Sequence, residues 1–287
     1  MKGVETGDDL SERIRFLIRD FVLHSPENCL QNAERERAWG EPLVGFSSGE
    51  DPLWQRFQEQ IGPFYWTPSE IFRETFPESE VGAGDLSVIS WILPQTEATK
   101  SENRKQTLYP AEGWARARVF GEEFNHRLRR HLVDCLLESG YLAVAPVLSP
   151  HWARQDSERF GYASNWSERH AAYASGLGTF GLSDGLITPL GMAMRCGSVV
   201  VQMQIPPTPR PYEDHHAYCL YFSQSRCGEC IFRCPVAAIS QSGHDKVACE
   251  RYHHQVIADY VKSHYGFEGY ACGLCQTGVP CESQIPT

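Results

Sequence analysis

The amino-acid sequence predicts an α/β domain over residues 1–210 and a smaller cysteine-rich module over residues 211–287. Two observations support this division. Segments with strand composition alternate with segments of helical periodicity before residue 206, an order typical of layered α/β architectures. After the linker-like run PPTPRPYED at 206–214, eight of the eleven cysteines lie beyond residue 218.

The first half of the chain contains the clearest periodic segments. Residues 9–24, DLSERIRFLIRDFVLH, have the spacing of an amphipathic helix. The run LSVISWIL at 86–93 predicts a buried strand that ends before Pro94. A long helix is predicted within 113–139, with Gly140 at its C-terminal cap. Apolar side chains recur in it every fourth residue: Phe120, Phe124, Leu128, Leu132 and Leu136.

Three further elements are predicted before the linker-like run. YLAVAPVL at 141–148 and SVVVQMQI at 198–205 have the composition of buried strands. A helix is predicted between them, over 166–175. Strands and helices thus continue to alternate up to the cysteine-rich module, which is why the α/β class is predicted.

Composition and charge limit the classes of function. Hydrophobic residues make up 41% of the chain and charged residues 22%, as in ordinary globular proteins. A formal net charge of −10 argues against broad electrostatic binding of nucleic acid. No apolar run reaches the roughly 18 residues that span a bilayer, and the first twenty residues lack a secretory apolar core. We therefore expect a cytoplasmic protein without a membrane partner.

The cysteines follow a spacing that favours iron–sulfur clusters. The first run is C-x7-C-x2-C-x3-C-P from Cys219 to Pro235; the second is Cys249 followed by C-x2-C-x5-C. In two-cluster ferredoxins the cysteine before proline binds the other cluster. On that basis one 4Fe–4S cluster is expected on Cys219, Cys227, Cys230 and Cys281, and a second on Cys234, Cys249, Cys272 and Cys275.

Two ligands depart from the regular ferredoxin spacing. That spacing would place the first cysteine at position 224, which is Gln224, so Cys219 must reach the cluster through a longer loop. Cys281 follows Pro280, whereas a regular run would place proline after the cysteine. Cys219 and Cys281 are therefore the two ligands that the pattern defines least.

Zinc is the alternative metal, because each C-x2-C pair is a common zinc knuckle. Zinc would use only those four cysteines and would leave the other four of the module without a role. Dense cysteines in a cytosolic chain more often bind metal than form disulfides. The three cysteines outside the module are each isolated and are expected to be small buried side chains: Cys29, Cys135 and Cys196.

The segment 164–201 is the second informative stretch. Asn165 and Glu168 have the spacing of a capping box at the start of the predicted helix. That helix runs into GLGTFG at 176–181, whose glycines tolerate positive φ and let the backbone approach a neighbour closely. Two interpretations remain open: a tight helix-to-strand turn, or a turn that lies against a flat ligand.

The run GLGTFGLSDGLITPLG, together with the two cysteine clusters, resembles the epoxyqueuosine reductases and the respiratory reductive dehalogenases over roughly residues 85–281. Those families use cobalamin beside two 4Fe–4S clusters, on a nitroreductase-like α/β domain with a bacterial-ferredoxin-like two-cluster module. The resemblance implies that a corrinoid would lie against the glycine-rich run. Its expected contacts are Gly176, Leu177, Gly178, Thr179, Gly181, Thr188 and Gly191.

The same resemblance suggests catalytic residues. Epoxyqueuosine reductases carry an acidic proton donor six residues before a Glu-Arg pair; that position here is Tyr162, and reductive dehalogenases use a tyrosine as proton donor. Glu168 and His170 are the other candidates. Each has a simpler alternative: Tyr162 as a packed aromatic, Glu168 as a helix-capping residue and His170 as a structural histidine. Leu182 stands where epoxyqueuosine reductases place a lysine.

The resemblance therefore predicts an iron–sulfur reductase that passes electrons from two clusters to cobalamin and reduces a small-molecule substrate. An external donor of the ferredoxin or flavodoxin type would supply the electrons. One alternative is a ferredoxin-like electron-transfer protein without a corrinoid. The other is a tRNA-modifying reductase, against which the acidic balance and the missing helical-repeat extension count. A corrinoid enzyme predicts a roomy pocket lined by residues 162–195, whereas an electron carrier predicts a filled core there.

Overall fold

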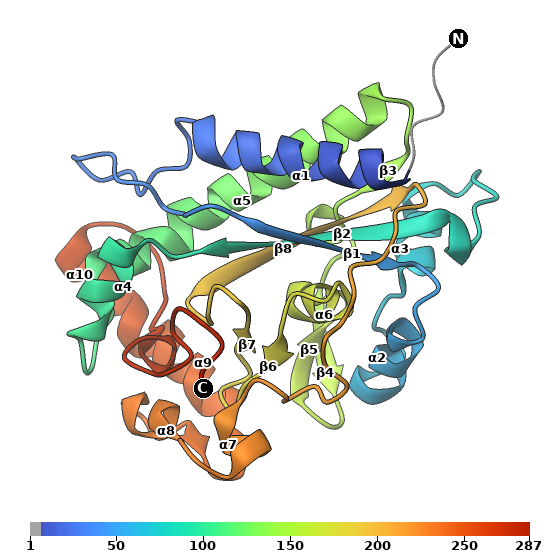
Figure 1. Cartoon of the computed structure of the whole chain (residues 1–287). Helices are drawn as coiled ribbons and strands as arrows, with labels where there is room; N and C mark the ends of the chain where they lie inside the picture. The colour runs from blue at the N-terminus through green and yellow to red at the C-terminus, as the bar shows by residue number, and fades with distance from the viewer. Residues whose placement is uncertain (1–6) are drawn as a thin grey trace.

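The computed structural model describes residues 7–287. At its centre lies a four-stranded sheet in the order β1-β2-β8-β3 (Figure 1). All three strand pairings are antiparallel, and β2 and β8 pair along nine residues, from Leu86 opposite Gln202 to Pro94 opposite Met194. The strands are β1 Leu43–Ser48, β2 Leu86–Pro94, β3 Ala143–Val144 and β8 Met194–Gln202.

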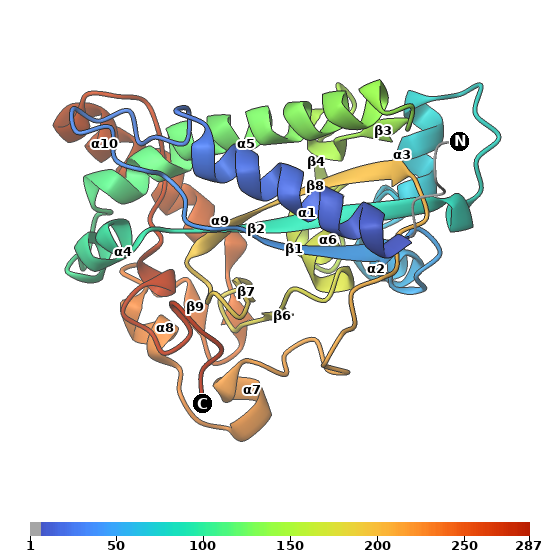
Figure 2. The same ribbon diagram turned by 45° about the horizontal axis from the view of Figure 1, so that its top comes forward.

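Helices cover both faces of this sheet. Helices α1 (Gly7–His24) and α5 (Glu112–Glu138) lie side by side on one face, as Figures 1 and 2 show. Along β2, Ile89 and Trp91 pack toward α1 and α5, whereas Val88 and Ile92 pack into the core on the opposite face. Side chains alternate between the two faces of a strand, so both faces of β2 must be apolar when helices cover both. The α/β prediction is confirmed in this coarse form.

The opposite face and the C-terminal part hold shorter elements. The opposite face carries three helices: α2 Leu53–Ile61, α3 Pro68–Thr75 and α6 Glu168–Ala174. Two small two-stranded sheets accompany them. One pairs β4 Arg154–Ser157 with β5 Gly161–Ser164, and the other pairs β6 Thr179–Phe180 with β7 Leu186–Ile187. Helix α4, Glu97–Arg104, precedes α5. The C-terminal part has α7 Leu220–Gln224, α8 Glu229–Arg233, β9 Ile239–Ser240, β10 Gly243–His244, α9 Lys246–Arg251, a π-helical turn Tyr252–Ile257 and α10 Ala258–Tyr265.

Most predicted elements are present, and two have different bounds. The predicted strand at 141–148 is only Ala143–Val144, because Pro146 starts a 3-10 turn. The predicted strand at 198–205 instead begins at Met194, where it pairs with the end of β2, and ends at Gln202. Within residues 7–287, no helix is both long and apolar enough to cross a membrane.

The C-terminal part packs tightly on the rest of the chain. The backbone N–H groups of Met192 and Ala193 donate to the carbonyls of Cys281 (2.8 Å) and Glu282 (3.1 Å). The Glu282 carboxylate also forms an ion pair with Arg104 of α4. These contacts connect the last cysteine to the loop that precedes β8.

Candidate metal centre

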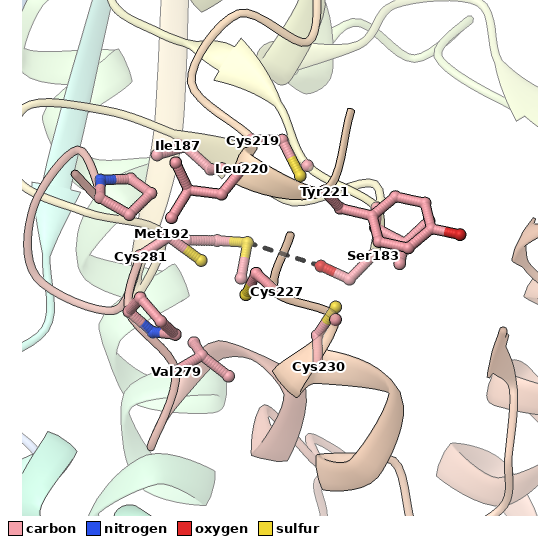
Figure 3. A pocket seen from close by; sticks show the side chains of 15 residues that line it. Ser183, Ile187, Met192, Cys219, Leu220, Tyr221, Cys227, Cys230, Val279 and Cys281 are labelled. Carbon is pink, nitrogen blue, oxygen red and sulfur yellow. Dashed lines mark hydrogen bonds between the residues drawn. The ribbon is translucent and has the colours of Figure 1, made fainter. Parts of the chain in front are cut away.

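Three cysteines from one short stretch of the chain and a fourth that is distant in sequence surround one cavity (Figure 3). The remaining lining of this cavity is largely apolar and includes Leu182, Ile187, Met192 and Val279. The thiol groups come from the loop before α7, from the start of α8 and from the C-terminal segment. They belong to Cys219, Cys227, Cys230 and Cys281, which are the four residues that the sequence assigns to one cluster.

The proximity of these thiols, which line one cavity, affects their pKa values. Burial and the charges of Cys219 and Cys227 raise the pKa of Cys230 to about 12. Burial and the charges of Cys230, Cys219 and Cys227 likewise raise the pKa of Cys281 to about 12. A bound cation would remove this mutual repulsion and hold the thiolates deprotonated. The donor set therefore fits an iron–sulfur cluster.

The unusual spacing between Cys219 and Cys227 has a structural explanation. The intervening residues form one short helix, α7, which occupies the extra length and ends at Ser225 in a left-handed conformation (φ 52°). Cys227 (φ 79°) and Gly228 (φ 117°) then reverse the chain into α8. Cys219 thus lies at the N-terminal end of α7 and faces the cavity with the other three cysteines.

The second predicted set is also brought together. Burial and the charges of Cys249 and Cys234 raise the pKa of Cys272 to about 12. Burial raises the pKa of Cys275 as well, together with the charges of Cys272, Cys249, Cys230 and Cys234. The Cys234 sulfur accepts a hydrogen bond from the Ala238 N–H at 3.2 Å. The charge of Cys230, a member of the first set, contributes to the raised pKa of Cys275 in the second set, because the two sets are neighbours.

A 4Fe–4S cluster and a single metal ion require different arrangements of their ligands. Among residues 7–287, no three His, Cys, Asp or Glu side chains converge as ligands of one ion. In a 4Fe–4S cluster each thiolate binds a different iron, so its four ligands surround a volume and do not meet at one point. The thiol-lined cavity has that arrangement.

Cys249 differs from the other ligands of its set. Although burial raises its pKa, hydrogen bonds from His244 and His253 outweigh burial and lower the pKa to about 6. The His253 Nε2 lies 4.0 Å from the Cys249 sulfur. His244 is in turn held by Asp184, with 3.1 Å between Nδ1 and Oδ2. Neither His244 nor His253 is among the site residues that the sequence predicts.

Tyr162 lies on β5, beside the helix that carries Cys249. Its hydroxyl donates to the Lys246 carbonyl at 3.4 Å, and Arg154 stacks over its ring at 5.4 Å from the centroid. Burial raises its pKa, to which the charge of Glu250 adds. Tyr162 is half-buried, so its phenol stays protonated and partly accessible near the second thiol set.

The expected capping box at Glu168 is wrong. Ser167, not Asn165, precedes α6, and the Asn165 side chain instead bonds to the backbone of Ala153 and His151. The Glu168 carboxylate accepts hydrogen bonds from Ser198 and from Arg129, the latter at 3.0 Å. A buried charge needs such partners, and Arg129 is only 1% exposed. Glu168 therefore connects α6 to α5 and β8.

His170 packs among aromatic rings. Its ring centroid lies 4.8 Å from that of Phe57 and 4.9 Å from that of Phe180, and its Nδ1 is 2.8 Å from the Ser167 hydroxyl. Burial, reinforced by the charges of Arg169 and Lys246, lowers its pKa to about 3. The imidazole is thus neutral and structural in its surroundings.

The glycines of the candidate corrinoid segment are used by the chain's own packing. A Cβ added at Gly178 would overlap the Ile187 carbonyl, and one at Gly191 would overlap the backbone of Glu282. At Gly176, where φ is +76°, an added Cβ would lie 2.8 Å from the Pro209 carbonyl. Only Gly181 has looser surroundings, with a side-chain methyl of Ile187 at 3.3 Å.

The other three candidates are also engaged within the chain. Leu177 is buried in the core. The Thr179 hydroxyl accepts from the Tyr218 N–H at 2.9 Å, and the Thr188 hydroxyl donates to the Gly191 carbonyl at 2.8 Å. Around α6 the core is filled by large rings: Trp54, Phe57, Tyr65, Trp166 and Tyr173. Most of the seven residues are thus held by contacts within the chain, whereas Gly181 lines the thiol-lined cavity.

The three isolated cysteines lie outside both thiol sets. Cys29 and Cys196 are buried, as expected, whereas Cys135 is partly exposed on α5. A residue that sequence reasoning overlooked is Arg129, which is buried between Glu122 and Glu168. One feature of the sequence could have identified this buried residue. Asn125 and Arg129 are polar, lie four residues apart and stand beside the apolar stripe of α5.

Comparisons with known proteins give a likeness in structure and none in sequence. No family model matches the sequence, and neither does any curated protein. An epoxyqueuosine reductase solved with an epoxyqueuosine-modified tRNA-Tyr stem loop has a TM-score of 0.55 at 16% identity, over 98% of this chain and 68% of that one. The epoxyqueuosine reductase of Bacillus subtilis gives 0.50 at 15% identity, with the same coverage.

A catabolic reductive dehalogenase has a TM-score of 0.52 at 15% identity, over 85% of this chain and 30% of that one. The present chain thus corresponds to less than a third of the dehalogenase. At these identities the likeness concerns the fold. The resemblance predicted from the glycine-rich run and the cysteines is confirmed at that level: the chain has the fold shared by epoxyqueuosine reductases and reductive dehalogenases.

Proposed function

We propose that this chain is an iron–sulfur oxidoreductase that holds two 4Fe–4S clusters. Residues 211–287 would form the bacterial-ferredoxin-like module, supported by the α/β domain of residues 1–210. The observation that carries the proposal is the meeting of Cys281 with Cys219, Cys227 and Cys230 around one cavity. These residues were paired from spacing alone, and their convergence from separate parts of the fold supports the pairing.

The surroundings of the thiols suit electron transfer. A 4Fe–4S cluster accepts and releases single electrons. Leu182, Ile187 and Met192 would keep water from part of the first cluster, whereas Cys227 is exposed. Phe232, which lies between Cys230 and Cys234 in sequence, is 83% exposed. An electron donor of the ferredoxin or flavodoxin type could approach the clusters at this surface.

The expected corrinoid is not part of the proposal. The glycines and threonines assigned to it are packed against the chain itself, and large aromatic rings fill the core around α6. This packing favours the alternative in which the clusters exchange electrons without cobalamin. When micromolar cobalamin is added to the anaerobic protein, the absorption spectrum of the mixture should equal the sum of the separate spectra of protein and cobalamin. The spectrum of a bound corrinoid would instead support the cobalamin-dependent reductase that the sequence predicts.

Tyr162 is the best placed of the three catalytic candidates. Glu168 and His170 are held by contacts that stabilise the fold, whereas Tyr162 is half-buried beside the helix of Cys249. A protonated phenol next to a reduced cluster could supply a proton to a small-molecule substrate that accepts electrons. One structural relative binds a tRNA stem loop, but the net charge of −10 disfavours nucleic acid as a substrate here.

Metal analysis of anaerobically purified protein tests the proposal. We expect about eight irons per chain. Cys281→Ser should reduce this to about four or fewer, because that sulfur completes the first set. Cys135→Ser is the matched control, since this cysteine lies on α5 outside both sets, and it should retain all the iron. Stoichiometric zinc in place of iron, or full iron in Cys281→Ser, would refute the proposal.

A further inference from the structure

The two thiol sets have different surroundings. Apolar side chains, among them Leu182, Ile187 and Met192, line the cavity of the first set. In the second set, the sulfur of Cys249 faces two imidazoles, those of His244 and His253. A hydrogen bond to a cluster-bound sulfur stabilises the negative charge added on reduction, and such bonds are among the features that set cluster potentials.

The local helix geometry holds His253 toward this sulfur. Cys249 lies on α9 and His253 follows four residues later, in the π-helical turn that continues α9. Residues four apart share a helix face, and the Nε2 of His253 lies 4.0 Å from the Cys249 sulfur. Short π-helical insertions in helices frequently occur at functional sites.

The neighbouring residue His254 points elsewhere. It is 46% exposed, and its ring packs at 4.4 Å from the ring centroid of Tyr270. Its Nε2 lies 3.9 Å from a Glu250 carboxylate oxygen. Two adjacent histidines of the same helix therefore differ in one respect that matters here: only His253 faces the Cys249 sulfur.

We propose that His253 is a positioning residue whose Nε2–H donates to the cluster-bound sulfur of Cys249 and raises the reduction potential of that cluster. The reaction concerned is a one-electron reduction of the cluster by the external donor. The added charge spreads over iron and sulfur, and the imidazole N–H stabilises it without losing its proton. His244, fixed by Asp184, is the second imidazole beside the same sulfur. This inference rests on the proposed two-cluster function.

A redox titration of the full-length protein, followed by electron paramagnetic resonance, tests the inference. In His253→Leu one of the two midpoint potentials should become more negative, and the other should stay at its native value. His253→Gln, which keeps an N–H donor, should recover part of the shift. His254→Leu is the matched control and should shift neither potential. Unchanged potentials in a fully loaded His253→Leu protein would overturn the inference.

A second measurement detects the contact between His253 and the cluster by isotope labelling. In native protein with 15N-labelled histidine, pulsed electron paramagnetic resonance of the reduced state should detect weak histidine nitrogen couplings on one cluster. His253→Gln should remove the coupling that belongs to His253, while the coupling of His244, the other imidazole beside Cys249, should remain. A fully loaded protein without the His253 coupling would contradict the inference while leaving the clusters intact. A native protein that contains no iron would instead refute the proposed function itself, so the two failures are distinguishable.

Discussion

Tyr162, Glu168 and His170 lie within nine residues of sequence but occupy three different environments. Tyr162 contacts α9, Glu168 bonds to Arg129 and Ser198, and His170 packs among aromatic rings. The sequence could suggest all three as candidates, but it could not separate them. The partners that decide their roles, such as Arg129, come from elements distant in sequence, and only tertiary packing brings them together.

His170 should make stability depend on pH. Its pKa falls from 6.5 to about 3 in the folded chain, so as the pH falls below 6.5 the unfolded state binds the proton first. The free energy of unfolding should therefore decrease by up to about 1.4 kcal/mol per pH unit between pH 6.5 and pH 3. Urea unfolding, followed by circular dichroism at about pH 7 and about pH 5.5, measures this decrease.

His170→Phe isolates that contribution, because phenylalanine fills the same aromatic site but has no proton to bind. The variant should lose less stability than the native protein over the same pH interval. An equal loss in both proteins would show that the neutral state of His170 is not what limits stability in acid.

Tyr162→Phe removes one hydroxyl, and with it the long hydrogen bond to the Lys246 carbonyl. We expect folding and iron content to survive, and turnover of an identified substrate, normalised to iron, to fall at least about 100-fold if the phenol is the general acid. Tyr141→Phe, at a position remote from the thiol sets, controls for generic tyrosine effects. Full turnover in a loaded Tyr162→Phe protein would leave Tyr162 a packing residue.

At the scale of elements, the turn from α6 into β6 shows what a glycine pattern can predict. GLGTFG indicated a sharp turn, and the chain does turn there, with Gly176 at φ +76°. The pattern did not reveal what the glycines approach. That neighbour is the chain itself: the Ile187 carbonyl next to Gly178 and residues 208–209 next to Gly176. A close backbone approach has the same sequence signature whether the neighbour is a ligand or another strand.

Gly178 and Gly181 form a matched pair for testing this packing. Gly178→Ala would place a methyl group against the Ile187 backbone, so it should destabilise the protein by about 2 kcal/mol or more. Gly181→Ala meets only a side-chain methyl of Ile187 at 3.3 Å, which can move, so its cost should stay within about 0.5 kcal/mol. Soluble yield and melting temperature measure the difference, and equal melting temperatures would contradict it.

At the scale of the whole molecule, the layered domain and the cysteine grouping could be predicted, but their contact could not. The periodicities gave helices and strands close to α1, β2 and α5. Nothing in the sequence indicated that the C-terminal segment would hydrogen-bond to Met192 and Ala193, or that Trp114 of α5 would pack on Gly273. Such contacts depend on shape complementarity between distant segments, which spacing does not encode.

Iron removal should therefore loosen more than the cysteine module. After anaerobic chelation, amide hydrogen exchange should accelerate at Met192 and Ala193, because their acceptors are the carbonyls of Cys281 and Glu282. Amides in the paired centre of β2 serve as the internal control and should remain protected. Mass spectrometry before and after chelation measures this exchange. Unchanged protection of the Met192 amide would show that the contact with Cys281 persists without metal.

The crossed arrangement of the cysteines has a consequence for how the protein acquires its iron. Cys234 belongs with the distant Cys249, Cys272 and Cys275, while Cys281 belongs with the earlier run. If the two proposed clusters bind these sets, each one would bring both cysteine runs together. It would thereby close the loops that the other cluster would otherwise have to close against chain entropy. We therefore expect cooperative uptake of iron: at partial supply, chains that hold a single cluster should be scarce, and the population should divide between empty and fully loaded molecules.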